Sequence, residues 1–433
     1  MDWTNTIDLK ETILSNSANA IQGKGYSDAI VARKIKALES FEKSGFPTTK
    51  HEEYKYFNLN QVLKNDFSIA ADSNVNADEI STFLLKDLEY HKLVFINGRY
   101  TSELSTILPG DNLVITGFAD TDQAVLEKYF AKEVYTANDP FAELNTAMAQ
   151  HGIYIKVLKN TVVKYPVVLH FISDAKSINP LVQSRNLIIA EENSQITVLE
   201  TYNTVGNKIS FTNSVTEIVQ HTNSIVDYYK LQDDAANSVH VGTTVASLVG
   251  KSVFNACTIT LNGAMVRNNM NVILQSEYSE ANFYGLYFTG NKQVVDNHTV
   301  ADHAVPNCQS NELYKGILDG ASTGVFNGKI FVKKDAQKTN AFQSNKNILL
   351  TKDATMNTKP QLEIFADDVK CSHGCTIGQL DEEPLFYLRA RGIGIESARA
   401  LLLVAFAQDI IDHIKIEPLK TYLSQAIEQR LSR

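Results

Sequence analysis

The sequence is poor in cysteine, with four cysteines among 433 residues. This density is far too low for the disulfide framework of a small secreted domain. The amino-terminal residues 1–5 also lack the basic and apolar segments of a signal peptide. We therefore expect free thiols in a reducing compartment, and a cytoplasmic protein.

Long apolar runs and an excess of positive charge are also absent. No stretch approaches the roughly 18 consecutive apolar residues of a transmembrane helix. The formal net charge is −9, whereas proteins that bind nucleic acids usually carry a basic field. With 44% hydrophobic and 21% charged residues, the composition is that of a soluble protein with a substantial core. We expect neither a membrane nor a nucleic acid as partner.

A nucleotide-binding loop is missing as well. Gly320, Gly324 and Gly328-Lys329 superficially resemble a phosphate loop. The required Gly-x-x-x-x-Gly-Lys-Ser/Thr is not met, because Thr323 takes the place of the first glycine and Ile330 follows the lysine. Any ATP-driven step must therefore depend on another subunit, and we expect a scaffold rather than an enzyme.

Short β-rich segments dominate the chain from about residue 152 to 378. They start roughly 13–15 residues apart, which is regular enough to count as a repeat. Within 266–274, apolar and polar residues alternate, as in a half-buried strand. A sandwich could have this length, but a parallel β-helix explains the monotony better, because each rung buries its inner face only against its neighbours. We predict a mainly β protein with three regions: a mainly helical 1–150, a parallel β-helix core at 151–378, and a helical 379–433.

Several features place the elements before this core. A helix is expected from Ser27 to Lys43, ended by Gly45. A strand at 93–96 runs into Asn97-Gly98, the strongest short hairpin signal. The charged and aromatic box at 51–56 is expected to be a solvated helix face with aromatic anchors.

Three helices are predicted after the core. Asp381 is a good N-cap for the first, Gly392 a good terminator, and Pro418 fits the start of the third. The middle helix is apolar on all sides at 401–407, so one buried face does not account for it. Leu401, Leu402 and Phe406 are candidate partner-binding residues, with burial between the core and the last helix as the equal alternative.

The candidate site is the run at 371–375, Cys-Ser-His-Gly-Cys. On a strand, Cys371, His373 and Cys375 point to one side. Thiolate and imidazole are the ligands that borderline-soft metals prefer. The outer two residues would be roughly 13 Å apart on a strand, too far to share one tetrahedral metal. Either the strand bends at Gly374, or Cys371 and His373 form half a site that another chain completes; we favour the second. The alternative is a purely structural role, in which the cysteines pack in the core and the histidine is hydrogen-bonded.

This run lies within a longer pattern that resembles the SufD branch of the SufB/SufD family of iron–sulfur cluster assembly proteins. The resemblance is dense over the last third of the chain and loose elsewhere. The segments that carry it are Asn311–Gly316, Phe326–Lys329, Ala336–Ala341, Lys359–Ile364, Asp367–Gly374, Gly378–Glu383 and Phe386–Ile393.

The resemblance implies a right-handed β-helix core and a non-ATPase scaffold subunit of a SufBCD-type complex. It implies that Cys371 and His373 support cluster assembly at the interface with SufB, with iron or an iron–sulfur cluster present transiently. It also implies that the ATPase SufC docks on the C-terminal helices. Cys375 departs from the family pattern, where a small residue is expected, so its thiol is either idle or alters the site.

A second group of potential ligands comprises Asp296, His298, Asp302, His303 and Cys308. The family pattern has an Asp, a Thr and a His that resemble Asp296, Thr299 and His303. A metal site is conceivable here, but a turn with a capping histidine is the favoured interpretation.

Two more functional assignments stay open. A SufB-type subunit is the runner-up, because the two branches share the fold; the Cys-Ser-His-Gly run favours SufD. A secreted polysaccharide-active β-helix enzyme is the candidate from a different class of protein. Flavin binding in the complex and a homodimer of the isolated chain are left open.

Overall fold

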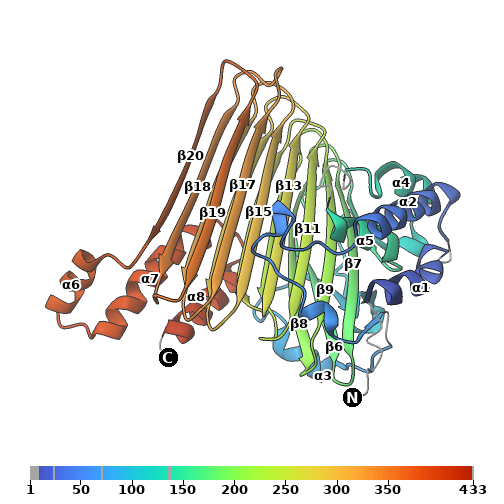
Figure 1. Ribbon diagram of the computed structural model, residues 1–433. Helices are drawn as coiled ribbons and strands as arrows, with labels where there is room; N and C mark the ends of the chain where they lie inside the picture. The colour runs from blue at the N-terminus through green and yellow to red at the C-terminus, as the bar shows by residue number, and fades with distance from the viewer. Residues whose placement is uncertain (1–8, 23–24, 70–71, 134–138, 432–433) are drawn as a thin grey trace.

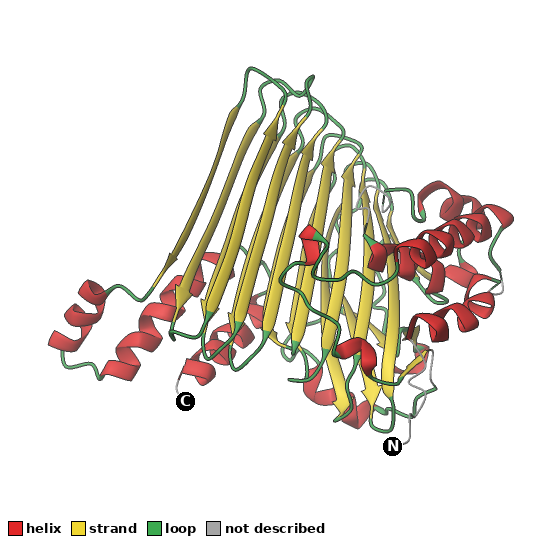
Figure 2. Cartoon of the chain, viewed as in Figure 1, coloured by secondary structure: helices red, strands yellow, loops and turns green. Residues whose placement is uncertain are grey.

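The computed structural model describes residues 9–22, 25–69, 72–133 and 139–431, and it is mainly β (Figures 1 and 2). Two long sheets face each other along a solenoid, with helices gathered at its two ends. The predicted fold class, a parallel β-helix core flanked by helical regions, is confirmed. Residues 1–5, which carry the signal-peptide prediction, lie outside the described residues. Within the described residues, no helix is both long and apolar enough to cross a membrane.

The solenoid consists of sixteen strands that follow one another without an intervening helix. They are β5 (Ile153–Val157), β6 (Val167–Ala175), β7 (Asn179–Ala190), β8 (Gln195–Gly206), β9 (Phe211–Gln220), β10 (Ile225–Asp233), β11 (Val239–Leu248), β12 (Val253–Asn262), β13 (Met265–Leu274), β14 (Glu280–Thr289), β15 (Val294–His303), β16 (Gln309–Leu318), β17 (Thr323–Val332), β18 (Asn340–Leu349), β19 (Thr355–Ile364) and β20 (Lys370–Gly378).

The region before the solenoid mixes helices with short strands. Its main elements are α1 (Leu9–Ile21), α2 (Asp28–Ser44), η1 (Glu52–Tyr54), η2 (Val62–Lys64), β1 (Phe67–Ile69), α3 (Ala77–Ile80), η3 (Ser81–Phe83), β2 (His91–Ile96), β3 (Arg99–Tyr100), η4 (Ser102–Leu104), β4 (Leu113–Gly117), η5 (Phe118–Asp120), α4 (Gln123–Tyr129) and α5 (Pro140–Met148). The chain ends in α6 (Glu382–Ala390), α7 (Ile395–Ile411) and α8 (Glu417–Leu431).

Odd- and even-numbered solenoid strands form separate sheets. Sheet A runs β19-β17-β15-β13-β11-β9-β7-β5-β4, and sheet B runs β20-β18-β16-β14-β12-β10-β8-β6-β2-β3. The solenoid strands pair parallel with one another. At the N-terminal end, β4 pairs antiparallel with β5, and β3 pairs antiparallel with β2. The two ends of the solenoid therefore differ: antiparallel strands finish one end, and β19 and β20 finish the other.

Successive rungs are in register, so residues of the same phase form columns along the solenoid. In β13, Val266, Met270, Val272 and Leu274 belong to the inner core, and the odd-numbered residues between them face outward. Aromatic rings stack along the same axis, as Phe95 stacks on Phe171 and Phe171 on Tyr202. A column thus places side chains about 30 residues apart in direct contact.

Asparagines hold one corner of the solenoid in the left-handed backbone region. Asn160, Asn193 and Asn223 have φ of 59°, 54° and 58°. Asparagine tolerates this region because its side chain can hydrogen-bond locally. Here the side chains also link the rungs, since the Asn193 amide donates to Asn160 (2.9 Å) and the Asn223 amide donates to Asn193 (3.1 Å).

Helices cover opposite outer faces. The Asn145 side chain of α5 donates to the backbone oxygens of Ser184 and Asn213, which ties the helix to β7 and β9 of sheet A. Helices α7 and α8 pack on sheet B through an apolar cluster that includes Leu403, Ile410 and Leu423. Near the last strands, the outer face of sheet A carries no α-helix among the described elements, and the 3₁₀ helix η1 reaches it where Glu52 pairs with Lys359 of β19 (Figure 1).

Several local predictions are confirmed. Helix α2 covers the predicted 27–43 and ends at Gly45, β2 and β3 form the predicted hairpin, and three C-terminal helices follow Asp381. One prediction is wrong: 294–303 is the regular strand β15 and no turn. The division at 150 and 378 stays a prediction, although β2 lies before residue 150 and pairs with β6.

Two glycines of the inner columns make room for tyrosine rings on the next rung. Gly285 pairs in register with Tyr314, and Gly316 pairs with Tyr287. A Cβ at Gly285 would lie 2.1 Å from the Tyr314 ring, and one at Gly316 would lie 2.3 Å from the Tyr287 ring. These glycines are therefore required by packing and not by backbone conformation.

Gly285→Ala should destabilise the protein by about 1–3 kcal/mol, because overpacking a close-packed interior forces ring or backbone shifts. Thermal and urea unfolding will measure the loss. Gly290→Ala is the control, since a Cβ there meets no atom within 4 Å. Equal stability of the two variants would contradict this account of the glycine–tyrosine pairs.

Candidate functional site

Cys371, His373 and Cys375 lie on β20, the last strand of sheet B. They pair in register with Ala341, Gln343 and Asn345 of β18, with no register shift at Gly374. The Cys371 side chain packs with Ile330, Val332 and Ala341, which belong to the interior. The three candidate ligands therefore share the inner side of an unbent strand, and the bend at Gly374 does not occur.

The inner side of β20 is open because no described strand follows it. His373 and Cys375 are exposed, and Cys371 is half-buried. Burial raises the pKa of the Cys371 thiol, which favours its protonated form. An unbent strand places Cys371 and Cys375 roughly 13 Å apart. Among the described residues, no group of three His, Cys, Asp or Glu side chains is arranged to hold a metal ion.

A tier of carboxamides lies directly behind these residues on β18. Gln343, Asn345 and Asn347 occupy its inner side, and all three are buried. The Asn347 amide donates to Asn345 Oδ1 (2.7 Å), and the Tyr287 hydroxyl donates to Asn347 Oδ1 (2.5 Å). These side chains thus form a hydrogen-bonded polar layer inside the solenoid one rung before its open end.

Glu312 of β16 extends this polar tier inward. Gln343 Nε2 donates to Glu312 Oε2 at 2.5 Å, and both side chains are buried. Burial raises the pKa of Glu312 to about 7, and the nearby side chains of Thr299 and Gln343 oppose that rise. The second carboxylate oxygen, Oε1, has no hydrogen-bond partner among the described residues.

The same end of the solenoid has free strand edges and exposed apolar side chains. Among the described strands, β20 pairs only with β18, and β19 pairs only with β17. Phe342, Ile364, Phe365 and Ile377 are at least 36% exposed. Long unpaired edges are normally protected, since they invite pairing with another chain. This end is therefore suited to binding another polypeptide.

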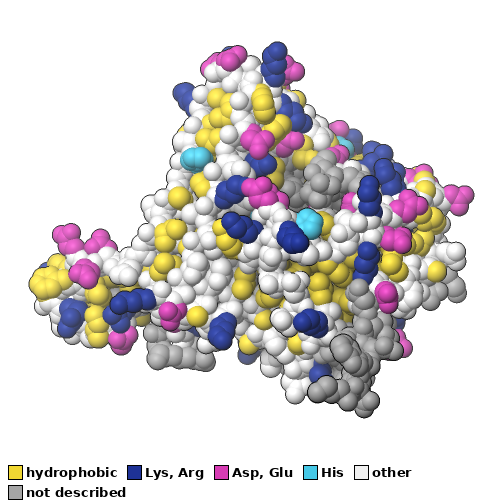
Figure 3. All heavy atoms as spheres, viewed as in Figure 1, with side chains coloured by type: hydrophobic (Ala, Val, Ile, Leu, Met, Phe, Trp, Pro, Cys, Tyr) yellow, Lys and Arg dark blue, Asp and Glu magenta, His cyan; other side chains and the backbone are white. Residues whose placement is uncertain are grey.

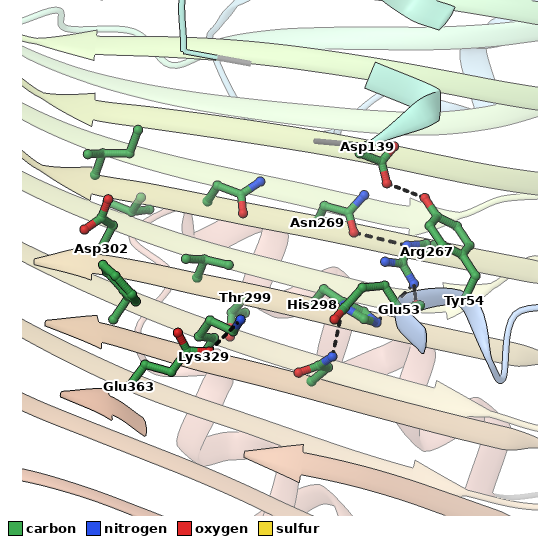
Figure 4. A pocket seen from close by; sticks show the side chains of 16 residues that line it. Glu53, Tyr54, Asp139, Arg267, Asn269, His298, Thr299, Asp302, Lys329 and Glu363 are labelled. Atoms are coloured by element: carbon green, nitrogen blue, oxygen red, sulfur yellow. Dashed lines mark hydrogen bonds and ion pairs between the residues drawn. The ribbon is translucent and has the colours of Figure 1, made fainter. Parts of the chain in front are cut away.

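The second group of candidate ligands is split between two places. Asp296 and His298 face outward from β15, where His298 lines a pocket beside η1 (Figure 4) and Asp296 lines the adjoining pocket. Arg267 Nη1 lies 2.5 Å from Asp296 Oδ2 and donates to the Glu53 backbone oxygen, and its guanidinium stacks over the Tyr54 ring. His298 lies between Glu53 (3.1 Å) and Asp296 (2.9 Å).

These contacts make the outer cluster a clamp on the N-terminal segment. Burial by itself raises the pKa of Asp296, but His298 and Arg267 hold it below its ordinary value. The box at 51–56 is a short 3₁₀ turn whose Tyr54 is an anchor, as expected, but Glu53 contacts the solenoid instead of only solvent. Asp302 faces outward as well and pairs with Lys333 at 3.2 Å.

His303 and Cys308 lie elsewhere, inside the solenoid. His303 Nε2 is 2.9 Å from Ser310 Oγ, and burial lowers the pKa of His303 to about 4. Cys308 is buried in the inner core, and its thiol donates to the Ser276 backbone oxygen. The predicted group of Asp296, His298, His303 and Cys308 is thus not brought together, because alternate strand residues face opposite sides.

The candidate partner-binding residues of α7 differ in exposure. Leu401 is 51% exposed, Leu402 is half-buried, and Phe406 packs on Lys315 of β16. Helix α6 has no buried residue, and its Phe386 and Tyr387 are 74% and 57% exposed. In Figures 1 and 3, α6 projects beyond the sheets and carries hydrophobic side chains on its surface. Phe386, Tyr387 and Leu401 therefore form the exposed apolar surface of this end.

Sequence reasoning missed Arg267, Glu312 and Gln343 as parts of the two sites. The inward-facing residues of β18 are Ala, Gln, Asn, Asn and Leu, at positions 341, 343, 345, 347 and 349. Because three of these five are polar, the segment lacks the apolar alternation by which a half-buried strand is recognised. The available signal was the alternating polar residues at 343, 345 and 347, which have the same spacing as the Cys-x-His-x-Cys run one rung later. Arg267 gave no such signal, because its partners Asp296 and Glu53 lie 29 and 214 residues away along the chain.

Comparison with known proteins gives two family matches. Residues 171–406 match the SufBD core domain of SUF system FeS cluster assembly, and residues 12–169 match the SufBD protein N-terminal region. An iron–sulfur cluster assembly SufBD family protein of Synechocystis is 32% identical, covering 94% of this chain and 92% of the relative. The iron–sulfur cluster assembly protein SufD of Escherichia coli is 30% identical, covering 96% and 98%. These matches give no support to a polysaccharide-active enzyme.

Glu312 should make the stability of the protein depend on pH. Its folded pKa is raised from 4.5 to about 7, so between these values the folded protein keeps a proton that the unfolded chain has lost. The free energy of unfolding should therefore fall as pH rises through this window, by up to about 1.4 kcal/mol per pH unit. Glu312→Gln should remove that fall.

Urea unfolding at several pH values will measure this effect. Glu103→Gln is the matched control, because Glu103 is exposed on η4. The same pH dependence in Glu312→Gln and in the unmodified protein would contradict the assignment.

Proposed function

Because this chain belongs to the SufBD family of iron–sulfur cluster assembly proteins, we propose that it is the SufD-type scaffold subunit of a SufBCD-type complex. In this proposal it has no ATPase activity of its own. It supports iron and sulfur acquisition and cluster assembly at its interface with a SufB-type partner, and a SufC-type ATPase drives the process.

The observation that carries the proposal is the open end of the solenoid. The unpaired edges of β19 and β20 lie beside inward-facing thiol and imidazole groups and exposed apolar side chains. A partner that continues the sheets would pair these edges and cover the apolar residues. It would also place its own ligands opposite Cys371 and His373.

A shared site fits the chemistry of these side chains. Imidazole and thiolate both bind iron, but one unbent strand cannot enclose an ion. A half-site on each subunit holds iron or a cluster only while the subunits are together. Such a site suits a scaffold, because it must release what it assembles. Cys375 lies at the exposed end of the same row, and we take its thiol to be idle.

In this proposal, the SufC-type partner binds the projecting C-terminal end. Phe386, Tyr387 and Leu401 are exposed there, whereas Leu403, Ile410 and Leu423 fix α7 and α8 on sheet B. Exposed aromatic residues beside a rigid base are typical of binding surfaces. Movement of the ATPase would then be transmitted through the helices to sheet B. Flavin in the complex, and a homodimer of the isolated chain through the same free edges, are secondary elements of the proposal.

His373→Ala should sharply reduce iron and acid-labile sulfide in a co-expressed complex purified without oxygen, and leave the subunit ratio unchanged. The reason is that the imidazole contributes a ligand but is exposed in the isolated subunit, so its removal costs little stability. Cys371→Ala should show a similar loss, and Cys375→Ala should be nearly silent.

Ser372→Ala is the matched control, since Ser372 lies on the same strand and faces outward. Normal cluster content in His373→Ala would return His373 to a structural role. Loss in Cys375→Ala alone would mean that Cys375, and not Cys371, is the functional thiol.

Phe386→Glu combined with Leu401→Glu should abolish co-purification of the SufC-type ATPase while the SufB-type partner stays bound. Glutamate is a good helix former, so the helices should survive while the apolar surface is lost. Gln425→Glu, on an exposed position of α8, is the control. Retention of the ATPase by the double variant would place its docking site elsewhere.

A SufB-type identity is the second candidate within the family, and the Cys-Ser-His-Gly run favours SufD. Co-expression with the SufC-type ATPase, with and without the SufB-type partner, separates the two. A SufD-type subunit should need the SufB-type partner for a cluster to appear, whereas a SufB-type subunit should not.

A further inference from the structure

We propose that Gln343 is a positioning residue for His373: Glu312 holds the amide nitrogen of Gln343, and the carbonyl oxygen of Gln343 accepts the N–H of the imidazole. The relay deepens the proposed function and rests on it for its purpose. Its three members come from consecutive rungs of sheet B.

The register brings the three side chains into one column. Glu312 pairs with Gln343 between β16 and β18, and Gln343 pairs with His373 between β18 and β20. Neighbouring strands are about 4.8 Å apart, so side chains of one column are within hydrogen-bonding reach. All three point to the inner side of the sheet, and no bulge interrupts their alignment.

The chemistry of Glu312 fixes the orientation of the Gln343 amide. When Glu312 is ionised, as at the alkaline pH of the test below, its carboxylate only accepts hydrogen bonds, so the NH₂ group of Gln343 faces it. Nε2 of Gln343 indeed donates to Glu312 Oε2 at 2.5 Å. The carbonyl oxygen Oε1 of Gln343 must then be available to a donor elsewhere.

That oxygen has no hydrogen-bond partner among the described residues, although Gln343 is only 4% exposed. A buried acceptor without a donor costs free energy, and one in a native site calls for an explanation. Neighbouring amides do not supply the donor. Asn345 Nδ2 donates to the Tyr314 backbone oxygen, and Asn347 Nδ2 donates to Asn345 and to the Thr376 backbone oxygen.

His373 makes no hydrogen bond to this oxygen in the structure, but it is the next side chain of the column and is exposed, so rotation of its ring would bring an N–H to Gln343 Oε1. A neutral imidazole has one N–H and one lone pair, and the partner of the N–H decides which nitrogen keeps the proton. Histidines that bind metals usually donate their other N–H to a carboxylate or carbonyl oxygen. If Gln343 takes the N–H, the remaining nitrogen presents its lone pair to the open end, where the partner subunit would lie.

The direct test is the tautomer of His373. The full chain with ¹⁵N-labelled histidine side chains would be studied by long-range ¹H–¹⁵N correlation at alkaline pH, where the imidazole is neutral. His373→Ala identifies the signals of this ring among the ten histidines. We expect one tautomer of His373 in the unmodified chain, and a mixture in Gln343→Met, which keeps the side-chain length but removes the carbonyl acceptor.

Two variants sharpen this result. Glu312→Gln should keep the tautomer, because its carbonyl oxygen still accepts from the Gln343 amide. Ser344→Ala, which changes the outward-facing neighbour on β18, should also leave it unchanged. If Gln343→Met does not fold, as judged by circular dichroism and melting temperature, Gln343→Asn replaces it. The shorter side chain cannot span the same gap, so the mixture is again expected.

An unchanged single tautomer in folded Gln343→Met or Gln343→Asn would overturn the relay. In the assembled complex, Gln343→Met should lower iron affinity about tenfold to a hundredfold with an unchanged subunit ratio. Failure of the relay and failure of the proposed function are distinguishable. A normal iron content in His373→Ala would refute the functional role of His373 but would not affect the tautomer result. An unchanged tautomer in the Gln343 variants would refute only the relay.

Discussion

The structure depends on the residue-by-residue register between parallel strands of consecutive rungs. Because every rung repeats the alignment of the one before, residues of one phase accumulate in columns. One such column gives the stacked rings of Phe95, Phe171 and Tyr202, and another gives Glu312, Gln343 and His373. A shift of one residue would turn each inner side chain outward. The same constraint that builds the core therefore positions the candidate site, and no separate loop or helix is needed to hold it.

A solenoid has two ends, and this protein treats them differently. At the N-terminal end the antiparallel strands β3 and β4 complete the sheets, whereas β19 and β20 leave two free edges among the described strands. Buried amides of β18 lie directly behind Cys371 and His373, so a hydrogen-bonded layer backs the last strand at the free edges.

The N-terminal and C-terminal regions pack on the two outer faces of the solenoid. On sheet A, the clamp of Arg267, Asp296, His298 and Glu53 ties the N-terminal segment to strands in the middle of the solenoid. On sheet B, α7 and α8 are fixed by an apolar cluster and by the pairing of Lys415 with Asp227. Helix α6 stays exposed. The described part of the molecule therefore has two separate exposed surfaces, one at the open end of the solenoid and one on the projecting helix.

Local sequence patterns were sufficient to predict several elements of the fold. Repeating strands and turn residues indicated the solenoid, caps and terminators marked the C-terminal helices, and alternation put Cys371, His373 and Cys375 on one side of a strand. Which distant residues meet depends on the tertiary fold, because a column joins residues about 30 positions apart and the clamp joins Glu53 to Arg267, more than 200 positions apart. The separation of His298 from His303 follows from strand phase once 294–303 is a strand. The position of Gln343 behind His373 does not, since periodicity gives the phase of a strand but not its neighbours.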